Sequence, residues 1–304
     1  MSTRILITGA SGFIGAHVAG LAVRRGLEVH ALGRSPIPAA KRTWSADLRD
    51  LTALRRVVAE VRPRAIVHLA AGGVAYGTGS VSDLLAVNTL ASTVLVEASG
   101  ELAEPAPVIM AGSGFEYRPQ ERPHREDDAL GSTSPYALSK IAAVEAARLL
   151  SGKVSVTVLR LFGVYGPGER PPRIVPAVVE SARRGCPIEL TSGEQVRDYA
   201  YVGDVAEAFL RFVELDPSPG LRVVNVGAGV PVPLRVMVEA LAGALARKGV
   251  EAQLRFGAKA QRADERSVYA PDISLLRETL GWGPSTPLDE GLERTVEAML
   301  VQPE

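Results

Sequence analysis

Short apolar runs rich in β-branched residues alternate with longer amphipathic stretches over the first two thirds of the chain. This alternation predicts parallel strands that are joined by crossover helices. The predicted strands are 4–8, 28–32, 65–69, 106–111, 154–159 and 222–226. The predicted helices are 13–25, 50–61, 82–99 and 135–151. The pattern therefore indicates an α/β fold with a doubly wound parallel sheet.

The regular pattern changes near Gly166, where a Gly-Pro-Gly-Glu-Arg-Pro-Pro run interrupts regular structure. Later helical stretches alternate with short turn-rich ones, and the strand-like segment 222–226 then returns to the sheet pattern. We therefore predict a larger sheet domain and a smaller, interleaved C-terminal lobe that binds substrate. The sheet domain spans 1–165 with 196–228 returning to it, and the lobe spans 166–195 and 229–304.

The composition narrows the class of protein. The 304 residues include 34 Lys and Arg and 34 Asp and Glu, so the chain has no net charge with which to hold nucleic acid or an acidic membrane surface. One cysteine and four scattered histidines predict neither an internal disulfide nor a metal site. We find no signal-peptide-like or spanning apolar stretch, so we expect a cytoplasmic protein with no membrane partner.

A glycine-rich turn, Gly9-Ala10-Ser11-Gly12-Phe13-Ile14-Gly15, follows the first predicted strand and opens the first predicted helix. Glycines let the backbone approach a pyrophosphate, and the helix N-terminus offers free N–H groups and a positive dipole end. The order of these elements favours a Rossmann-type dinucleotide-binding domain over a tight turn without a ligand. The predicted cofactor contacts here are Gly9, Ser11, Gly12, Phe13, Ile14 and Gly15.

The second predicted strand ends in Gly33-Arg34-Ser35, where a carboxylate would normally accept the ribose hydroxyls of NAD. Arg34 would instead pair with a 2′-phosphate, and Ser35 would add a hydroxyl donor. These residues predict NADP as the cofactor, with NAD still open. The alternative is that Arg34 is a solvated surface residue.

Three separated residues suggest chemistry on a bound alcohol or ketone. Tyr136 and Lys140 stand four residues apart on a predicted helix that Ser134 caps, so they share one face. A phenol titrates far above neutrality and needs a nearby ammonium before it can exchange protons at working pH. Ser113 ends the fourth predicted strand, where such sheets bind ligands, and its hydroxyl can orient a carbonyl. Ser113, Tyr136 and Lys140 are the predicted catalytic residues, and the last two are also predicted cofactor contacts.

At these residues the sequence resembles the extended short-chain dehydrogenase/reductases, in particular their sugar-nucleotide epimerase, dehydratase and ketoreductase group. The resemblance covers nearly the whole chain. It implies further cofactor contacts at Asp47, Leu48, Leu69, Ala70, Ala71, Asn88 and Phe162. It implies nucleotide-sugar contacts at Gly73, Val74, Ser113, Gly114, Phe115, Gly163, Val164, Arg173, Arg197 and Arg262.

The resemblance also implies roles for particular segments. Arg197 and Arg262 would hold the nucleotide diphosphate, and Tyr269 also matches the epimerase pattern. Helices 82–99 and 135–151 would form the interface of a homodimer.

Two departures from the family pattern narrow the expected activity. The 4,6-dehydratases carry an Asp-Glu pair directly after the catalytic Ser or Thr, whereas this chain has Gly114-Phe115, which argues against dehydration. The usual Asn of the Asn-Val-Tyr-Gly-Pro loop is Gly163 here, which removes an amide expected near the substrate.

Our leading hypothesis is NADPH-dependent reduction of a nucleotide-activated 4-keto-6-deoxy sugar, with Tyr136 as the general acid and Lys140 and Ser113 assisting. The alternative is an NAD-dependent 4-epimerase of a UDP- or dTDP-hexose that uses the same residues. A non-catalytic dinucleotide sensor is the third hypothesis. Outside the site, we expect the polar loop Arg122–Asp128 to be solvated surface, with a mobile lid as the alternative, and Cys186 to be a buried thiol.

Overall fold

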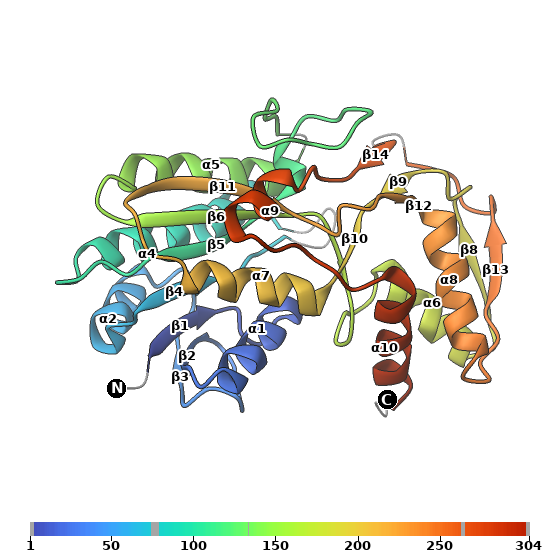
Figure 1. Cartoon of the computed structure of the whole chain (residues 1–304), viewed down its shortest axis with the longest axis horizontal. Helices are drawn as coiled ribbons and strands as arrows, with labels where there is room; N and C mark the ends of the chain where they lie inside the picture. The colour runs from blue at the N-terminus through green and yellow to red at the C-terminus, as the bar shows by residue number, and fades with distance from the viewer. Residues whose placement is uncertain (1–2, 74–78, 133, 263–264, 302–304) are drawn as a thin grey trace.

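The computed structural model describes residues 3–73, 79–132, 134–262 and 265–301, and its centre is a seven-stranded parallel sheet (Figure 1). The strand order is β11-β6-β5-β4-β1-β2-β3. The strands are β1 (Arg4–Thr8), β2 (Glu28–Gly33), β3 (Arg42–Ser45), β4 (Ala65–His68), β5 (Val108–Ser113), β6 (Ser155–Leu161) and β11 (Gly220–Val226). The predicted Rossmann-type sheet is confirmed. The sequence missed β3, an edge strand of four residues with no fully buried side chain.

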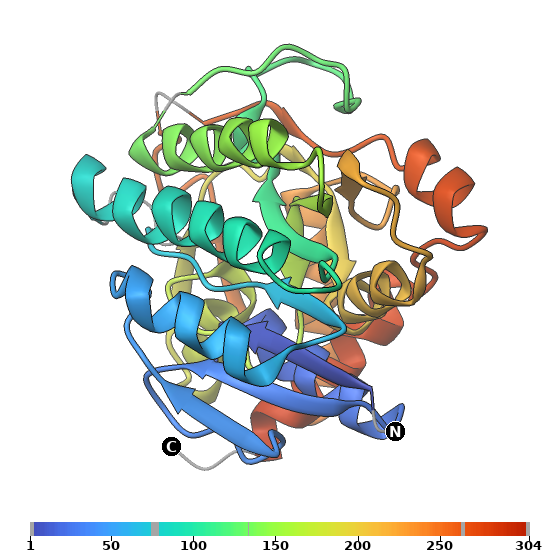
Figure 2. The same cartoon turned by 90° about the vertical axis from the view of Figure 1, so that its left-hand side faces the viewer.

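Helices cover both faces of this sheet. One face carries α2 (Leu51–Val61), α4 (Ala91–Gly100) and α5 (Pro135–Leu150), which lie side by side in Figure 2. The other carries α1 (Phe13–Arg24), α7 (Val202–Glu214) and α9 (Ser274–Leu280). On β1, the Leu6 side chain packs on the face that carries α2, α4 and α5, whereas Ile5 and Ile7 pack on the face that carries α1, α7 and α9. Because successive side chains point to opposite faces, a strand covered on both sides is apolar throughout.

The predicted helix 82–99 contains three helical segments, α3 (Val81–Leu84), the π-helical turn η1 (Leu85–Leu90) and α4. Together they form the one helical stretch, among the residues that the structure describes, with the length and hydropathy of a membrane-spanning segment. Our sequence analysis found no such stretch. Core helices of soluble proteins pass the same test, and Leu95 and Val96 are fully buried against the sheet.

The second lobe has its own apolar cluster, which includes Val178, Met237, Leu241 and Leu292. Its elements are α6 (Ile174–Arg183), β8 (Pro187–Leu190), α8 (Leu234–Ala246), β13 (Gln253–Phe256) and α10 (Leu288–Val301), on the right of Figure 1. Between lobe and sheet lie the short strands β7 (Gly163–Tyr165), β9 (Val196–Arg197), β10 (Tyr199–Tyr201), β12 (Val232–Pro233) and β14 (Val268–Tyr269).

The connectivity differs from the predicted division at one place. As expected, α7 and β11 return to the sheet layers. However, Ile273 and Leu276, which we assigned to the lobe, pack in the cluster beneath the sheet. They do so because α9 lies against β11, an edge strand whose apolar side chains need cover. The exact division of the chain into two domains stays a prediction.

Two expectations outside the site were wrong. Cys186 is exposed, because it lies in the turn between α6 and β8, directly after Gly185 with its positive φ of 65°. The loop Arg122–Asp128 is not merely solvated surface, because the His124 side chain is fully buried. The His124 N–H donates to the Ala270 carbonyl at 2.8 Å, and its carbonyl accepts from the Asp272 N–H at 2.7 Å, so the loop is tied to the chain beside it.

Because two histidines are buried, we predict that the free energy of unfolding decreases as the pH is lowered. Burial lowers the pKa of His68 to about 3 and that of His124 to about 4, with positive charges on Lys140 and Arg266 adding to the respective effects. In the unfolded chain both titrate near 6.5. Below that pH the unfolded chain binds protons that the folded chain does not. The free energy of unfolding therefore falls as pH drops from about 6.5 to 4, by up to about 1.4 kcal/mol per pH unit for each histidine.

His124→Phe tests this prediction. The imidazole stacks on Tyr117 at 4.9 Å, and neither ring nitrogen has a hydrogen-bond partner among the described residues, so a phenyl ring should fit. Urea unfolding at pH 7 and pH 5 should show a smaller loss of stability in the variant than in the natural chain. Equal losses in both proteins would contradict this explanation.

Candidate active site

The glycine-rich turn after β1 packs so tightly that two of its glycines are sterically required. Gly9 has a φ of 72°, and a Cβ at this position would lie 2.6 Å from the Ala70 nitrogen. A Cβ on Gly15 would lie 2.0 Å from the Gly9 carbonyl oxygen. The turn therefore brings the start of α1 against the loop after β4.

The start of α1 fits the pyrophosphate of a dinucleotide. Its N-cap residue is Gly12, and no side chain caps the helix among the residues that the structure describes. The first-turn N–H groups at Phe13 and Ile14, together with the positive end of the helix dipole, are therefore available to an anion. His17 Nε2 lies 2.8 Å from the Pro167 carbonyl oxygen, which ties α1 to the loop after β7. Ser11 is exposed beside this helix end.

At the adenosine end, Arg34 and Ser35 are exposed directly after β2. The Asp47 carboxylate accepts hydrogen bonds from the backbone and side chain of Arg49, at 2.9 and 3.2 Å. These bonds, the backbone one first, lower the pKa of Asp47, and the charge of Arg34 adds to the effect. The structure thus brings Arg34 and Asp47 to one place, while Leu48 packs against the apolar cluster under α2.

Asn88 connects the loop after β4 to the helix that carries the tyrosine and lysine. Its side chain accepts from the Gly72 N–H at 2.8 Å and donates to the Gly72 carbonyl at 3.1 Å and the Ser139 hydroxyl at 2.9 Å. Asn88 lies in η1, and π-helical turns often occur at functional sites. These bonds place Asn88 as a support for the site. A role as a direct cofactor contact stays a prediction.

The loop that Asn88 supports runs beside the glycine-rich turn. The Leu69 N–H donates to the Thr8 carbonyl at 3.1 Å, and the Ala70 N–H donates to the Thr8 hydroxyl at 3.3 Å. Ala71 and Gly73 follow and are partly exposed. Val74, a predicted substrate contact, lies outside the described residues.

Ser113, Tyr136 and Lys140 meet at the carboxyl end of β5. The helix α5 begins as predicted, because the Ser134 hydroxyl accepts the Ala137 N–H at 3.1 Å and Pro135 fills the first position. The buried Lys140 ammonium donates to the Ala111 carbonyl at 2.9 Å and lies 5.9 Å from the centre of the Tyr136 ring. The Ser113 side chain lies close enough to Tyr136 to lower the pKa of the phenol. The predicted triad is therefore brought together.

Burial sets the proton affinities of these groups. Desolvation raises the pKa of Tyr136 to about 12, with the Glu116 charge adding to it, whereas the Ser113 side chain and the Arg173 charge oppose it. Desolvation lowers the pKa of Lys140 to about 8, and Glu116 opposes this shift. The lysine is therefore mostly charged at neutral pH, so it can stabilise a phenolate.

A second phenol faces the same serine. Tyr269 on β14 is buried, stacks on Phe115 at 4.7 Å and donates to the Leu161 carbonyl at 3.5 Å. The Ser113 side chain lies close enough to lower the pKa of this phenol. Burial raises the pKa of Tyr269 well above its ordinary value. Arg266 closes this end of the site by donating to the carbonyls of Gly114, Phe115 and Tyr117 at 2.9 to 3.3 Å. Sequence reasoning missed Arg266, which no motif marks.

The two predicted diphosphate arginines converge on one carboxylate. Both Arg197 and Arg262 form ion pairs with Glu265, the latter at 3.0 Å. Arg173 at the start of α6 lies 3.7 Å from the buried Glu169, and its charge lowers the pKa values of Tyr136 and Tyr269. Arg173 therefore lies near the two phenols, and Arg197 lies near Arg266, whose pKa it lowers.

Comparison with known proteins identifies the family. A family model described as NAD dependent epimerase/dehydratase matches residues 5–227. The chain belongs to this family. A probable UDP-glucuronate 4-epimerase of Rhizobium meliloti (strain 1021) is 30% identical over 97% of this chain and 96% of its own length. A dTDP-6-deoxy-L-talose 4-dehydrogenase (NAD(P)+) of Kitasatospora kifunensis is 29% identical over 99% and 96%.

A solved structure of the protein MoeE5 in complex with UDP-glucuronic acid and NAD has a TM-score of 0.85, with 31% identity over 98% of this chain and 99% of that one. MoeE5 in complex with UDP-glucose and NAD gives the same TM-score and identity. This chain is therefore an enzyme of the sugar-nucleotide epimerase/dehydratase class.

Two departures from the family pattern have steric causes. A Cβ at Gly114 would lie 2.6 Å from the ring of the buried Phe162, so the acidic side chain of a dehydratase does not fit there without moving that ring. A Cβ at Gly163 would lie 2.1 Å from the Asp198 carbonyl oxygen, because β7 pairs closely with β10. Phe162, a predicted cofactor contact, and Val164, a predicted substrate contact, are both buried.

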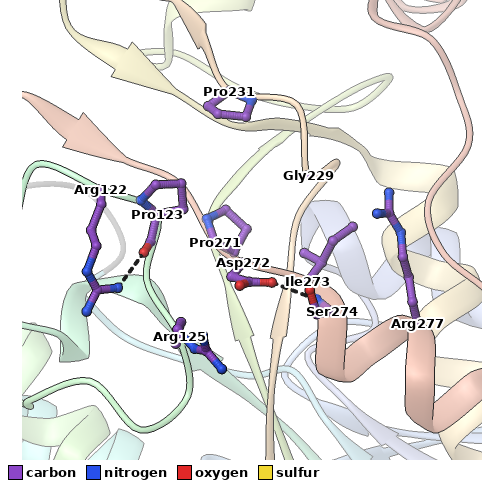
Figure 3. A pocket seen from close by; sticks show the side chains of 10 residues that line it. All are labelled: Arg122, Pro123, Arg125, Gly229, Pro231, Pro271, Asp272, Ile273, Ser274 and Arg277. Atoms are coloured by element: carbon purple, nitrogen blue, oxygen red, sulfur yellow. Dashed lines mark hydrogen bonds between the residues drawn. The ribbon is translucent and has the colours of Figure 1, made fainter.

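A hollow of about 370 Å³ lies at the start of α9, between the loops that carry Pro123 and Gly229 (Figure 3). Figure 3 shows Arg122, Arg125 and Arg277 around it, with the Asp272 side chain between them. Arg122 forms an ion pair with Asp128 at 2.5 Å, and Asp272 accepts the Ser274 N–H at 2.9 Å. None of the residues that line it belongs to the glycine-rich turn or to the triad.

Proposed function

We propose that this enzyme is an NAD-dependent 4-epimerase that acts on a UDP-activated hexose or hexuronic acid. The observation that carries the proposal is the intact convergence of Ser113, Tyr136 and Lys140 beside a dinucleotide-binding turn. The similarity to a UDP-glucuronate 4-epimerase and to MoeE5 with its two UDP-sugars supports this substrate class. These comparisons favour our alternative hypothesis over the ketoreductase.

Three residues of this chain would take part in the proton transfer at C4 of the sugar. The glycine-rich turn and the start of α1 would hold NAD, whose chemistry would be reversible hydride transfer at C4 of the sugar. Tyr136 would accept the proton of the C4 hydroxyl during oxidation and give it back during reduction. The Lys140 ammonium would stabilise the phenolate form of Tyr136 that accepts this proton, and the Ser113 hydroxyl would donate to the sugar oxygen. The two half-reactions cancel, so the enzyme would show no net oxidation or reduction.

Arg197 and Arg262 would hold the diphosphate of the substrate in place of their present partner Glu265. We predict that Arg197→Ala raises the KM for the UDP-sugar about 10- to 100-fold, the value of one charged hydrogen-bond pair, with a smaller change in kcat. The control is Arg184→Ala, which changes an exposed arginine of the second lobe, and steady-state kinetics measure both variants. An unchanged KM in Arg197→Ala would exclude this diphosphate contact.

The second candidate function is the NADPH-dependent 4-ketoreductase. Two observations favour it. Arg34 and Ser35 lie exposed directly after β2, and the chain is similar to a dTDP-6-deoxy-L-talose 4-dehydrogenase (NAD(P)+). If NADP is the cofactor, Arg34→Ala should raise the KM for NADPH about 10- to 100-fold and leave that for NADH unchanged.

The mass of the dinucleotide that copurifies with the enzyme separates the two candidates. We expect bound NAD for the epimerase. NADP, together with NADPH oxidation by a 4-keto sugar nucleotide, would favour the reductase.

We also propose that the enzyme is a homodimer. Three exposed leucines lie on the helical stretches 82–99 and 135–151 that we expect at the dimer interface. They are Leu90, Leu138 and Leu149, which are 49%, 39% and 87% exposed. Exposed leucines on adjacent helices are typical of an interface between subunits. Light scattering should give twice the chain mass, and Leu149→Glu should shift the equilibrium toward monomer. A monomer at micromolar concentration in the natural enzyme would exclude the dimer.

A further inference from the structure

Glu116, three residues after the catalytic serine, is fully buried and uses both carboxylate oxygens. One oxygen accepts the Ser113 N–H at 2.7 Å, and the other accepts Arg160 Nε at 2.7 Å. The Ser113 hydroxyl in turn accepts the Phe115 N–H at 3.2 Å, so a reciprocal cap closes the short helical turn Gly114–Glu116. The backbone of the serine is therefore held by the carboxylate.

Arg160 connects this carboxylate to the sheet. It lies on β6 and is itself buried, and it donates to the Tyr117 hydroxyl at 2.8 Å. That hydroxyl donates to the Asn225 amide oxygen at 2.8 Å, and Asn225 on β11 donates to the His124 carbonyl at 2.9 Å. The polar groups of this buried network are hydrogen-bonded to one another, and two of its residues lie on the neighbouring strands β6 and β11. Such a network favours a single arrangement of its side chains, so it fixes the position of Ser113.

Glu116 is also the acid that acts on both other members of the triad. The Lys140 ammonium donates to the Ala111 carbonyl at 2.9 Å, and a Cβ on the next residue, Gly112, would lie 2.9 Å from Glu116 Oε1, so the carboxylate lies beside the strand end that holds the lysine. Its charge accordingly raises the pKa values of both Tyr136 and Lys140. The other groups that act on or near the pair are His68 on β4, Arg173 before α6, and Tyr269 and Arg266 beside Ser113. Burial keeps His68 uncharged at neutral pH, and Arg173, Arg266 and Arg160 are cations. Glu116 is therefore the group that places a negative charge near Tyr136 and Lys140.

We propose that Glu116 is a positioning residue, which holds Ser113 against Tyr136 and supplies the negative charge that faces the Lys140 ammonium. The consequence for catalysis rests on the proposed function, because it assumes that these three residues transfer a proton at C4. The consequence for the proton affinity of Lys140 does not depend on which sugar is the substrate.

Glu116→Gln tests the proposal, because the amide keeps an acceptor for the Ser113 N–H and removes the charge. We expect kcat to fall about 10-fold or more. We also expect the basic limb of the pH profile of kcat to move about one unit toward acid, since loss of the charge lets Lys140 lose its proton more easily.

The matched control is Tyr117→Phe, which breaks the hydrogen bonds of the same network without removing a charge. It should lower stability but leave the pH profile in place. If both variants lose stability and neither moves the profile, Glu116 is structural only and the proposal is overturned. If Glu116→Gln does not fold because Arg160 is left unpaired, Glu116→Gln/Arg160→Leu, which carries no unpaired charge, replaces it.

A measurement that does not use activity separates this proposal from the proposed function. In enzyme labelled with ¹⁵N-lysine, the Lys140 side-chain resonance is assigned by its absence in Lys140→Met. Its titration midpoint should fall by about one pH unit in the variant without the Glu116 charge. An unchanged midpoint overturns the proposal even if the enzyme epimerises its substrate. A shifted midpoint in an enzyme that turns over no UDP-sugar supports the proposal and rejects the epimerase.

Discussion

Tyr136→Phe should reduce kcat/KM for the UDP-sugar by about 10²- to 10⁴-fold, the usual contribution of a positioned general acid–base group. The substitution removes only the phenol hydroxyl beside Ser113, and the ring beside Lys140 remains. The fold should therefore persist, with an unchanged circular dichroism spectrum. The measurement is the initial rate of epimer formation, with the enzyme concentration raised to detect the residual activity.

Tyr201→Phe is the control for this substitution, because Tyr201 lies at the start of α7 and packs against Tyr165 rather than the triad. Its activity should stay within about threefold of the natural enzyme. Equal activities of the natural enzyme and Tyr136→Phe would remove the tyrosine from the chemistry.

Arg160→Leu should lower the free energy of unfolding by about 3–5 kcal/mol, the usual cost of removing one partner of a buried ion pair. The substitution leaves Glu116 buried without its cation, and it also removes a donor to the Tyr117 hydroxyl. Urea unfolding at pH 7, followed by tryptophan fluorescence, measures the change.

The double variant Glu116→Gln/Arg160→Leu separates the cost of an unpaired charge from the value of the pair. Because it buries no unpaired charge, it should be more stable than Arg160→Leu alone. A double variant that is equally or more unstable would show that the network stabilises the fold by its hydrogen bonds and packing rather than by charge compensation.

The sheet could be predicted from sequence because its central strands are buried on both faces. Runs such as Ile5 to Ile7 are apolar without interruption, and helices of regular period separate them. The edge strand β3 could not be predicted, because Arg42-Thr43-Trp44-Ser45 is short and half exposed. The Arg42 guanidinium lies over the ring of the half-buried Trp44, 3.5 Å from its centre.

The triad could be predicted because each member has a local signal. Tyr136 and Lys140 share a helix face, and Ser113 ends a strand, so spacing and element order suffice. The supports of the triad could not be predicted. Glu116 and Arg160 are 44 residues apart, and charged residues in such positions are usually solvated. Only the pairing of β5 with β6 brings them together.

The loop around His124 shows the same limit. Its charged neighbours are typical of a solvated segment, yet its backbone hydrogen bonds to residues 270 and 272 bury the imidazole against Tyr117. Contacts between distant segments decided this outcome, and no local pattern reports them. The sequence therefore predicts where the chemistry lies better than how it is supported.

The most direct test of the central claim is to follow the purified enzyme with UDP-glucuronic acid or UDP-glucose by ¹H NMR, with no dinucleotide added. We predict that the C4 epimer accumulates to equilibrium while the absorbance at 340 nm shows no net change. Failure of both sugars to epimerise, together with stoichiometric oxidation of added NADPH by a 4-keto sugar nucleotide, would contradict the epimerase and favour the reductase.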